Sequence, residues 1–242
     1  MASTLVIADL HLCPSRQDIT RCFTEFLQQN TAKHQALYIL GDLFETWIGD
    51  DDRSEFNLYI AKAIKSFSIS TPVYFIHGNR DFLIGQRFAK EAGMTLLPES
   101  FQTKIHGHNV LFMHGDQLCL DDVDYQKFRK RSRSWWWQKL ILLLPLKKRQ
   151  RIAENIRAKS KESQKYKSDE IMDVAPRAVR RVIESSNCDW LVHGHTHRPN
   201  IHDLGDNKLR MVVGDWYTQG SVLELSEDSG TLKTLSFDNK KS

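Results

Sequence analysis

Three histidines at alternate positions, in the stretch LVHGHTHRP at residues 191–199, constrain this chain more than any other feature. They follow an apolar run that is typical of a strand, and they precede a proline, which cannot continue the hydrogen bonds of a sheet. One histidine beside an apolar run usually belongs to a core, whereas two on a tight turn are typical of metal ligands. A metal can bind here only if the rest of the chain supplies further ligands.

Other apolar runs of the chain also end in polar residues that can bind a metal or a phosphate. These runs cover residues 4–11, 36–42, 72–81, 109–116 and 209–215. Apolar residues with helical spacing over 19–27 and 56–64 separate the first runs. Alternating strands and helices predict a layered α/β fold, in which active residues gather beyond the carboxyl ends of the strands.

Length and composition narrow the classes of protein. The chain has 242 residues, 40% hydrophobic and 26% charged, which suits one α/β domain over residues 1–242. Strand patterns vanish over 120–187, where Lys and Arg become dense, and we interpret this stretch as a helical insertion. The net charge of +4 is compatible with anionic substrates but does not by itself indicate nucleic acid. The scattered cysteines favour a reducing compartment, and the N-terminus is typical of a first strand rather than a signal peptide.

The longest apolar stretch, WWWQKLILLLPL at 135–146, falls short of the ~20 residues that span a bilayer. Basic segments flank it at 127–134 and 147–151. Large apolar side chains between cations are typical of an interfacial segment, so we predict a lid that meets acyl chains and an anionic membrane surface. Its residues are Trp136, Leu140, Leu142 and Leu143. The alternative is a hairpin buried in the insertion's own core, and both can hold together.

The polar strand ends together hold enough ligands for two metal ions. They are Asp9-x-His11, Gly41-Asp42, Gly78-Asn79-Arg80-Asp81, His114-Gly115-Asp116 and Gly194-His195-Thr196-His197. Mixed oxygen and nitrogen ligands without cysteine suit Mn, Fe or Zn, and Mn is the best match for an oxygen-rich site that handles phosphate. Two ions ~3.5–4 Å apart can clamp a phosphoryl group and activate water.

The series DLH, GDLFE, GNRD, HGD and GHTHRP resembles the calcineurin-like metallophosphoesterases. Each motif alone is weak, but all of them occur in order between Asp9 and about Asp215, each after an apolar run. The resemblance implies the αββα sandwich of that family, with the insertion as a cap outside the shared core. It also implies two groups of metal ligands, bridged by Asp42. One group is Asp9, His11 and His197, and the other is Asn79, His114 and His195.

The remaining histidines and acids of these motifs have plainer interpretations. We expect His193 to lie in the core or beside the ligands, and Asp81 and Asp116 to orient ligand histidines or loop amides. The other histidines have no ligand spacing and are expected to be structural or solvated. They are His34, His77, His106, His108 and His202.

Arg80 departs from the pattern of the family, which mostly reads GNH where this chain reads GNR. The histidine of GNH is thought to protonate the leaving group, and arginine cannot do so because its pKa lies above about 12. A phosphate monoester, with a second pKa near ~6, can leave without a proton, whereas an alkoxide cannot. We therefore predict cleavage of a diphosphate, with Arg80 gripping phosphate and with Asn79 and Asp42 as further catalytic residues.

GNRDF, GDLFETWIGDD and HGHTHRP, together with the insertion, resemble the branch of this family that hydrolyses UDP-2,3-diacylglucosamine in lipid A biosynthesis. This resemblance covers essentially the full chain. It implies two Mn²⁺ ions as cofactors and attack of water on the α-phosphorus, which gives UMP and 2,3-diacylglucosamine 1-phosphate. It also implies a cytoplasmic enzyme, peripheral on the inner membrane, with no nucleic-acid partner.

The same resemblance implies a set of substrate contacts. They are Asn79, Arg80, Asp122, Ser160, Gln164, Lys167 and His195. Gln164 departs from the asparagine of that branch, and an ordinary polar helix surface is the alternative for the contacts in the insertion. Two other functions also remain open. A nucleotide or nucleic-acid phosphodiesterase could use the same metals, although the apolar run disfavours it, and a non-catalytic scaffold would not need the complete ligand set.

Overall fold

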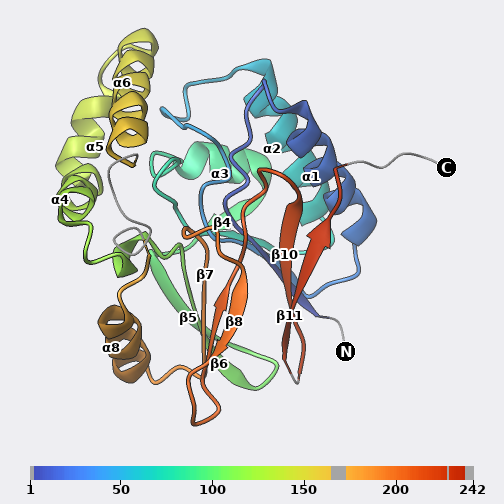
Figure 1. Cartoon of the computed structure of the whole chain (residues 1–242). Helices are drawn as coiled ribbons and strands as arrows, with labels where there is room; N and C mark the ends of the chain where they lie inside the picture. The colour runs from blue at the N-terminus through green and yellow to red at the C-terminus, as the bar shows by residue number, and fades with distance from the viewer. Residues whose placement is uncertain (1–2, 165–172, 228, 238–242) are drawn as a thin grey trace.

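Two β-sheets face each other at the centre of the molecule, with helices on both outer sides (Figure 1). The computed structural model describes residues 3–164, 173–227 and 229–237, without the side chains of 161, 163 and 164. The larger sheet has the order β11-β10-β1-β2-β3-β4, and the smaller one β5-β6-β7-β9-β8. Their strands are β1 (Thr4–Ile7), β2 (Ala36–Ile39), β3 (Val73–Phe75), β4 (Met94–Leu96), β5 (Ser100–Ile105), β6 (His108–Met113), β7 (Trp190–His193), β8 (Asn200–Asp203), β9 (Leu209–Val212), β10 (Gly220–Leu225) and β11 (Gly230–Leu235).

Parallel strands occupy the middle of each sheet, and antiparallel strands occupy most of the edges. β1, β2, β3 and β4 run parallel, as do β6, β7 and β9. Every residue of β1, β2 and β7 is buried, because both faces of these strands are covered. β10 and β11 pair antiparallel as the terminal hairpin, with Gly220 opposite Leu235.

Three apolar clusters hold the helices and the two sheets together as four layers. α1 (Gln17–Asn30), α2 (Glu55–Ser68) and α3 (Gln86–Ala92) pack on the larger sheet. A second cluster fills the space between the sheets, where the rings of Tyr38 and Phe112 stack 4.3 Å apart. A third joins the smaller sheet to α8 (Pro176–Ser186). This order of layers confirms the predicted αββα sandwich.

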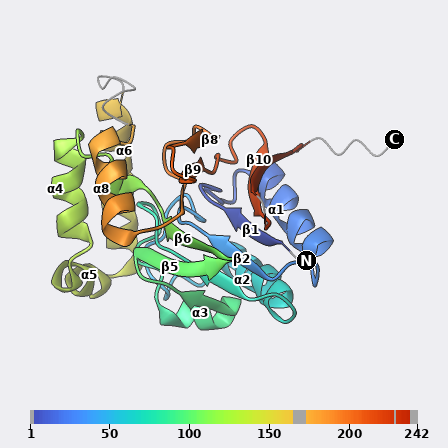
Figure 2. The same cartoon turned by 90° about the horizontal axis from the view of Figure 1, so that it is seen from below.

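Three helices form an arm at one side of the sandwich in both views (Figures 1 and 2). They are α4 (Val123–Ser132), α5 (Trp135–Leu142) and α6 (Leu146–Gln164), and the short 3-10 helix η1 (Asp116–Leu118) leads into them. We call α4, α5 and α6 the arm. The boundaries of the insertion, 120–187, stay a prediction; α8, which lies within them, packs on the smaller sheet. Among the described residues, no helix is long and apolar enough to cross a membrane.

Candidate metal centre

Tight turns directly beyond the strand ends carry most of the predicted ligands. Asp9, His11, Asp42, His195 and His197 all adopt positive φ, at 54°, 51°, 52°, 69° and 56°. This left-handed conformation costs a residue other than glycine roughly 1–3 kcal/mol, and it persists where the surrounding structure enforces it, often at functional sites. The backbone therefore bends sharply at each of these positions, which lets side chains from separate strands meet.

The first group of predicted ligands is together. Asp9, His11 and His197 each offer an atom within 4.8 Å of the others. His197 Nε2 lies 3.5 Å from Asp9 Oδ1, and the rings of His11 and His197 are 5.4 Å apart in an edge-on arrangement. Asp9 and His11 are buried, whereas His197 is partly exposed.

The second group lies on the other side of Asp42. Asp9, Asp42 and His114 also offer atoms within 4.8 Å of one another. His114 Nε2 is 3.0 Å from Asn79 Oδ1, and its ring is 4.9 Å from that of His195.

Asp42 faces a histidine of each group. Its Oδ2 is 3.9 Å from His11 Nε2, and its Oδ1 is 3.9 Å from His114 Nε2. The carboxylate is thus placed as a bridge between two ligand sets.

Buried atoms without partners show that these residues fit a cation. Among the described residues, Asp9 Oδ1 and His11 Nε2 are buried and have no hydrogen-bond partner. Buried polar atoms are nearly always paired, so each orphan needs an explanation, and a bound cation provides one. Burial lowers the pKa of His195 to about 4, so that its ring is neutral at pH 7 and keeps a lone pair. Buried carboxylates and neutral imidazoles form a donor set for divalent metal ions.

Oxygen atoms lie near the outer ring nitrogens of three of these histidines. His114 Nδ1 donates to Leu40 O at 2.7 Å. His197 Nδ1 is 3.3 Å from Asp215 Oδ2, and His11 Nδ1 is 3.0 Å from Glu45 Oε2. A hydrogen bond to such an oxygen fixes the orientation of a ligand ring and leaves its other nitrogen for a metal.

Asp81 plays the supporting role that the sequence predicts. It accepts hydrogen bonds from the amides of Leu43 and Gly78, at 2.7 and 2.8 Å, so it holds the two loops that carry Asp42 and Asn79. Burial, together with the charge of Asp42, raises its pKa to about 7.

Asp116 differs from the prediction, because the partners of its carboxylate are side chains of the arm. It accepts from the Tyr125 hydroxyl at 2.6 Å and from Arg129 Nε at 2.9 Å. The two residues lie on α4, which the sequence pattern alone could not bring to this strand end. His193 is buried in β7, with Nδ1 2.9 Å from Gly194 O, in keeping with the predicted core position.

The amino-acid sequence of this chain is similar to those of known proteins. Residues 2–199 match the family described as calcineurin-like phosphoesterase. The chain belongs to this family. It is 50% identical over 234 residues to a UDP-2,3-diacylglucosamine hydrolase of Shewanella piezotolerans, covering 97% of this chain and 98% of the relative. It is 52% identical over 230 residues to a UDP-2,3-diacylglucosamine hydrolase of Escherichia coli O7:K1, covering 93% and 96%. The predicted resemblance to these hydrolases is thereby confirmed.

A solved structure described as a novel archaeal phosphodiesterase shares the fold. Its TM-score is 0.50 with 13% identity, over 96% of this chain and 99% of that one. At that identity the likeness concerns the fold alone.

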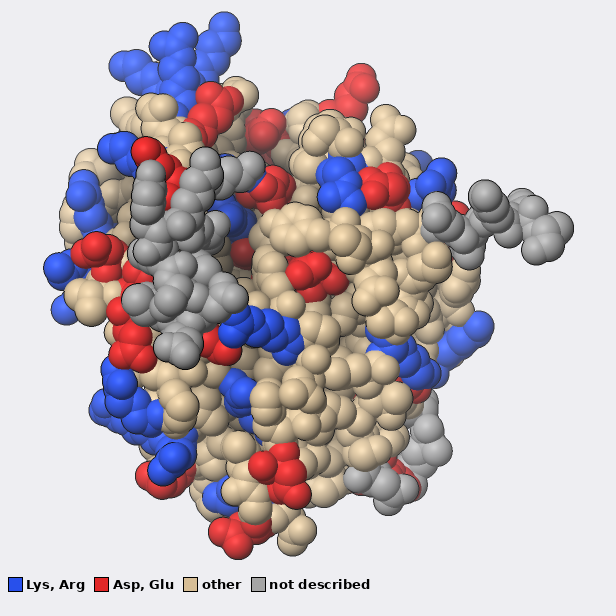
Figure 3. Space-filling model, viewed as in Figure 1, with Lys and Arg blue, Asp and Glu red and all other residues tan. Residues whose placement is uncertain are grey.

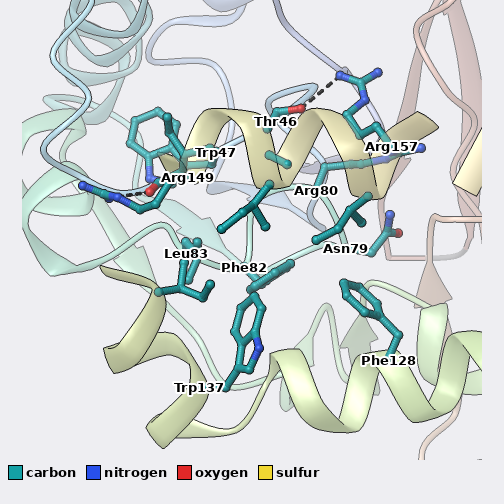
Figure 4. A pocket seen from close by; sticks show the side chains of 15 residues that line it. Thr46, Trp47, Asn79, Arg80, Phe82, Leu83, Phe128, Trp137, Arg149 and Arg157 are labelled. Atoms are coloured by element: carbon teal, nitrogen blue, oxygen red, sulfur yellow. Dashed lines mark hydrogen bonds between the residues drawn. The ribbon is translucent and has the colours of Figure 1, made fainter. Parts of the chain in front are cut away.

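An apolar pocket adjoins the candidate metal centre of this calcineurin-like phosphoesterase (Figure 4). Loops beyond β2 and β3 form one wall, and the arm forms the other. The lining includes Trp47, Asn79, Arg80, Phe82, Phe128, Trp137, Ile141, Ile152 and Ile156. The rings of Phe82 and Trp137 lie 6.1 Å apart across it. Arg80 Nε is buried without a hydrogen-bond partner among the described residues.

The predicted lid residues of this phosphoesterase do not line the pocket. Trp136, Leu140, Leu142 and Leu143 are 47%, 57%, 42% and 81% exposed, whereas their neighbours Trp137 and Ile141 line it. Their role as a lid over acyl chains stays a prediction. A role of the four residues at a membrane stays a prediction. The alternative of a buried hairpin does not describe α5, because it has no buried residue.

Two of the predicted substrate contacts in the insertion can be located. Asp122 is the N-cap of α4, and its side chain accepts from the amide of Tyr125 at 3.1 Å. Ser160 lies partly exposed on α6. The side chain of Gln164 and the whole of Lys167 lie outside the described residues. Sequence reasoning missed Glu45, which stands in the quoted motif GDLFE only three residues beyond Asp42, and it missed Asp215 as a partner of His197.

Proposed function

We propose that the chain hydrolyses the diphosphate of UDP-2,3-diacylglucosamine to UMP and 2,3-diacylglucosamine 1-phosphate, in lipid A biosynthesis. One observation carries the proposal: the metal centre adjoins an apolar pocket, and Asn79 and Arg80 belong to both. A substrate with a diphosphate at one end and acyl chains at the other matches this arrangement. The names of the relatives with about half of their residues identical support the same substrate.

Two Mn²⁺ ions are the proposed cofactors. Asp9, His11 and His197 would hold one ion, Asn79, His114 and His195 the other, and Asp42 both. When bound, such ions polarise phosphoryl oxygens and lower the pKa of the attacking water.

Arg80 is proposed to grip the phosphate that leaves. Its backbone amide donates to Asp42 Oδ1 at 2.8 Å, which fixes the residue beside the centre. Its buried Nε is available to an anion, and a guanidinium can offset charge that develops on phosphate oxygens. Because arginine does not give up a proton, this role fits a leaving group that is itself a phosphate monoester.

The pocket is proposed to hold acyl chain. Each buried CH₂ contributes about 0.8 kcal/mol, so even a short segment among Phe82, Phe128 and Trp137 gains several kcal/mol. Residues 120–187 would then act as a cap over the lipid half of the substrate. Asp122, Ser160, Gln164, Lys167 and His195 stay predicted substrate contacts.

The outer face of the arm is proposed to meet the inner membrane from the cytoplasm. α5 exposes Trp136 and Leu140, and α6 begins with the basic sequence LKKRQR. Figure 3 shows Lys and Arg gathered at the tip of the arm. Exposed apolar residues beside cations bind anionic lipid through both burial and charge.

One assay tests the proposal. The protein with Mn²⁺ is offered UDP-2,3-diacylglucosamine, UDP-glucose and an aryl phosphodiester in ¹⁸O water, and products are identified by mass spectrometry. We expect fast cleavage of the acylated substrate alone, with ¹⁸O in UMP. Preference for the aryl phosphodiester would favour a general phosphodiesterase, and ¹⁸O in the lipid phosphate would contradict attack at the α-phosphorus.

A further inference from the structure

Glu45 lies between the candidate metal centre and the arm. One oxygen, Oε2, is 3.0 Å from His11 Nδ1, and the other, Oε1, forms an ion pair with Arg157 of α6. The Glu45 side chain is 19% exposed and that of His11 is 2% exposed, so water competes little for this contact.

The facing atoms of His11 and Glu45 have no other partner. Among the described residues, His11 Nδ1 and Glu45 Oε2 are both buried and make no hydrogen bond. The 3.0 Å between them is a hydrogen-bond distance, and a hydrogen bond from Nδ1 to Oε2 would give both buried atoms a partner. Donation from Nδ1 would leave the lone pair on Nε2, which faces Asp42 Oδ2 at 3.9 Å.

Arg157 links this pair to the arm. Its guanidinium donates to Thr46 Oγ1 at 3.0 Å (Figure 4) and to the backbone oxygen of Glu45 at 3.4 Å. The same side chain lines the apolar pocket. A single guanidinium therefore contacts the pocket, the loop beyond β2 and the carboxylate behind His11.

We propose that Glu45 positions His11 as a metal ligand and that Arg157 makes this positioning depend on the docked arm. The proposal rests on the proposed metal role of His11. The carboxylate fixes the tautomer and the angle of the imidazole, and Arg157 holds the carboxylate in place. The arm that encloses the acyl chains is thereby coupled to the metal centre, although none of its residues is a predicted ligand.

Arg149 offers a matched control for Arg157. It also belongs to α6 and fastens the arm to the loop beyond β2, donating to Ile48 O at 2.5 Å and to Asp51 Oδ1 at 2.8 Å. Among the described residues, no hydrogen bond or ion pair joins Ile48 or Asp51 to a predicted ligand. Loss of Arg149 therefore loosens the arm without releasing Glu45.

The experiment measures metal affinity by titrating the metal-free protein with Co²⁺ and following its visible absorption. We expect Glu45→Ala to weaken Co²⁺ binding about 10–100-fold, the usual effect of losing a group that orients a ligand. Glu45→Gln keeps an acceptor for His11 but loses the ion pair, so it and Arg157→Ala should show smaller losses. The double variant Glu45→Gln/Arg157→Ala should bind Co²⁺ about as well as whichever of the two single variants binds it less tightly. The losses should not add, because both residues act through the same contact with His11. Arg149→Ala should leave Co²⁺ affinity unchanged.

We call the proposed chain of contacts from Arg157 through Glu45 to His11 the relay. Other outcomes test the relay separately from the metal role of His11. Equal losses in Arg157→Ala and Arg149→Ala would overturn the relay, because any loosening of the arm would then suffice. Unchanged affinity in Glu45→Gln and Glu45→Ala, beside a clear loss in His11→Ala, would overturn the relay and leave the metal site intact. Unchanged affinity in His11→Ala would overturn the metal role of His11, and the relay with it. Far-ultraviolet circular dichroism shows that each variant is folded.

Discussion

The backbone amide of Arg80 donates a hydrogen bond to Asp42, whereas its buried side-chain Nε has no hydrogen-bond partner among the described residues. We expect Arg80→Ala to lower turnover of UDP-2,3-diacylglucosamine about 10²–10³-fold, the usual cost of removing a group that stabilises charge in the transition state. Bound Mn²⁺, measured by mass spectrometry, should be unchanged, because guanidinium is no metal ligand. Arg80→Lys should recover only part of the rate, because it keeps the charge but loses the bidentate grip.

The role of Arg80 can also be tested by comparing substrates with different leaving groups. If Arg80 serves a leaving group that needs no proton, the wild-type rate should fall steeply as the leaving group becomes a stronger base. Arg80→His should raise activity on aryl phosphodiesters without restoring diphosphate cleavage. A wild-type enzyme that prefers alkyl phosphomonoesters would contradict this role.

Gly41 and Gly107 form a natural pair for testing how tightly the centre is packed. Their φ angles are +87° and +88°, so alanine suffers the same backbone strain at both, about 1–2 kcal/mol. A Cβ at Gly41 would lie 2.5 Å from Gly78 Cα, whereas nothing lies within 4 Å at Gly107. We expect Gly107→Ala to lose only the strain energy in urea unfolding, and Gly41→Ala to lose more and to bind metal poorly. Equal losses would mean that the loops behind Asp42 can move apart freely.

At the scale of residues, the sequence predicted which side chains meet but not how each is held. The proposed ligands follow apolar runs at recognisable spacings, and parallel strands bring their carboxyl ends to one edge. Glu45 and Asp215 were missed because their roles depend on ring orientations that spacing does not encode. Asp116 was misjudged for the same reason, since its partners Tyr125 and Arg129 come from α4.

At the scale of elements, burial decided which strands could be predicted. β1, β2 and β7 are buried along their whole length and appear in the sequence as continuous apolar runs. The edge strands β5 and β8 expose about half of their residues and contain polar side chains, so their patterns are weak. α5 carries apolar residues all round, and such a helix does not reveal which face packs and which meets solvent.

The two faces of α5 can be separated by paired substitutions. Trp137→Ser with Ile141→Ser removes pocket-lining residues, so the apparent affinity for the acylated substrate should fall, by roughly several kcal/mol from lost burial. Trp136→Ser with Leu140→Ser alters the exposed face and should weaken binding to vesicles of anionic phospholipid. Michaelis constants with detergent-dispersed substrate and vesicle co-sedimentation check the two effects.

Each pair of substitutions is the control for the other. The inner pair should leave vesicle binding nearly intact, and the outer pair should leave hydrolysis in detergent nearly intact. If the outer pair weakened hydrolysis in detergent as strongly as the inner pair, the exposed face would belong to the acyl site and the division of α5 would be wrong. Thermal unfolding of both variants excludes general loss of structure.

At the scale of the whole molecule, the candidate metal centre joins strands from both sheets. Asp9 and Asp42 follow strands of the larger sheet, and His114 and His195 follow strands of the smaller one. The centre therefore exists only when the two sheets are packed together, and an unfolded chain cannot present it. Bound metal should accordingly stabilise the packed pair of sheets as a unit.

Metal removal tests this coupling. A ligand present at 100 times its dissociation constant adds about 2.7 kcal/mol to the free energy of unfolding if it binds the folded state alone. For a chain of this length each kcal/mol shifts the melting temperature by roughly 2–4 °C, so saturating Mn²⁺ should raise it by roughly 5–10 °C over the protein in EDTA.

The variant Asp42→Ala removes the proposed bridge and should abolish most of this shift in melting temperature. Both ions then lose a ligand, and without a bound ion Asp9 Oδ1 stays unpaired among the described residues. A shift of the same size in Asp42→Ala would mean that Mn²⁺ stabilises the chain elsewhere. Differential scanning calorimetry at several Mn²⁺ concentrations distinguishes binding at the candidate centre from binding elsewhere. A melting-temperature shift that comes from the candidate centre should follow the Mn²⁺ affinity that is measured by titration.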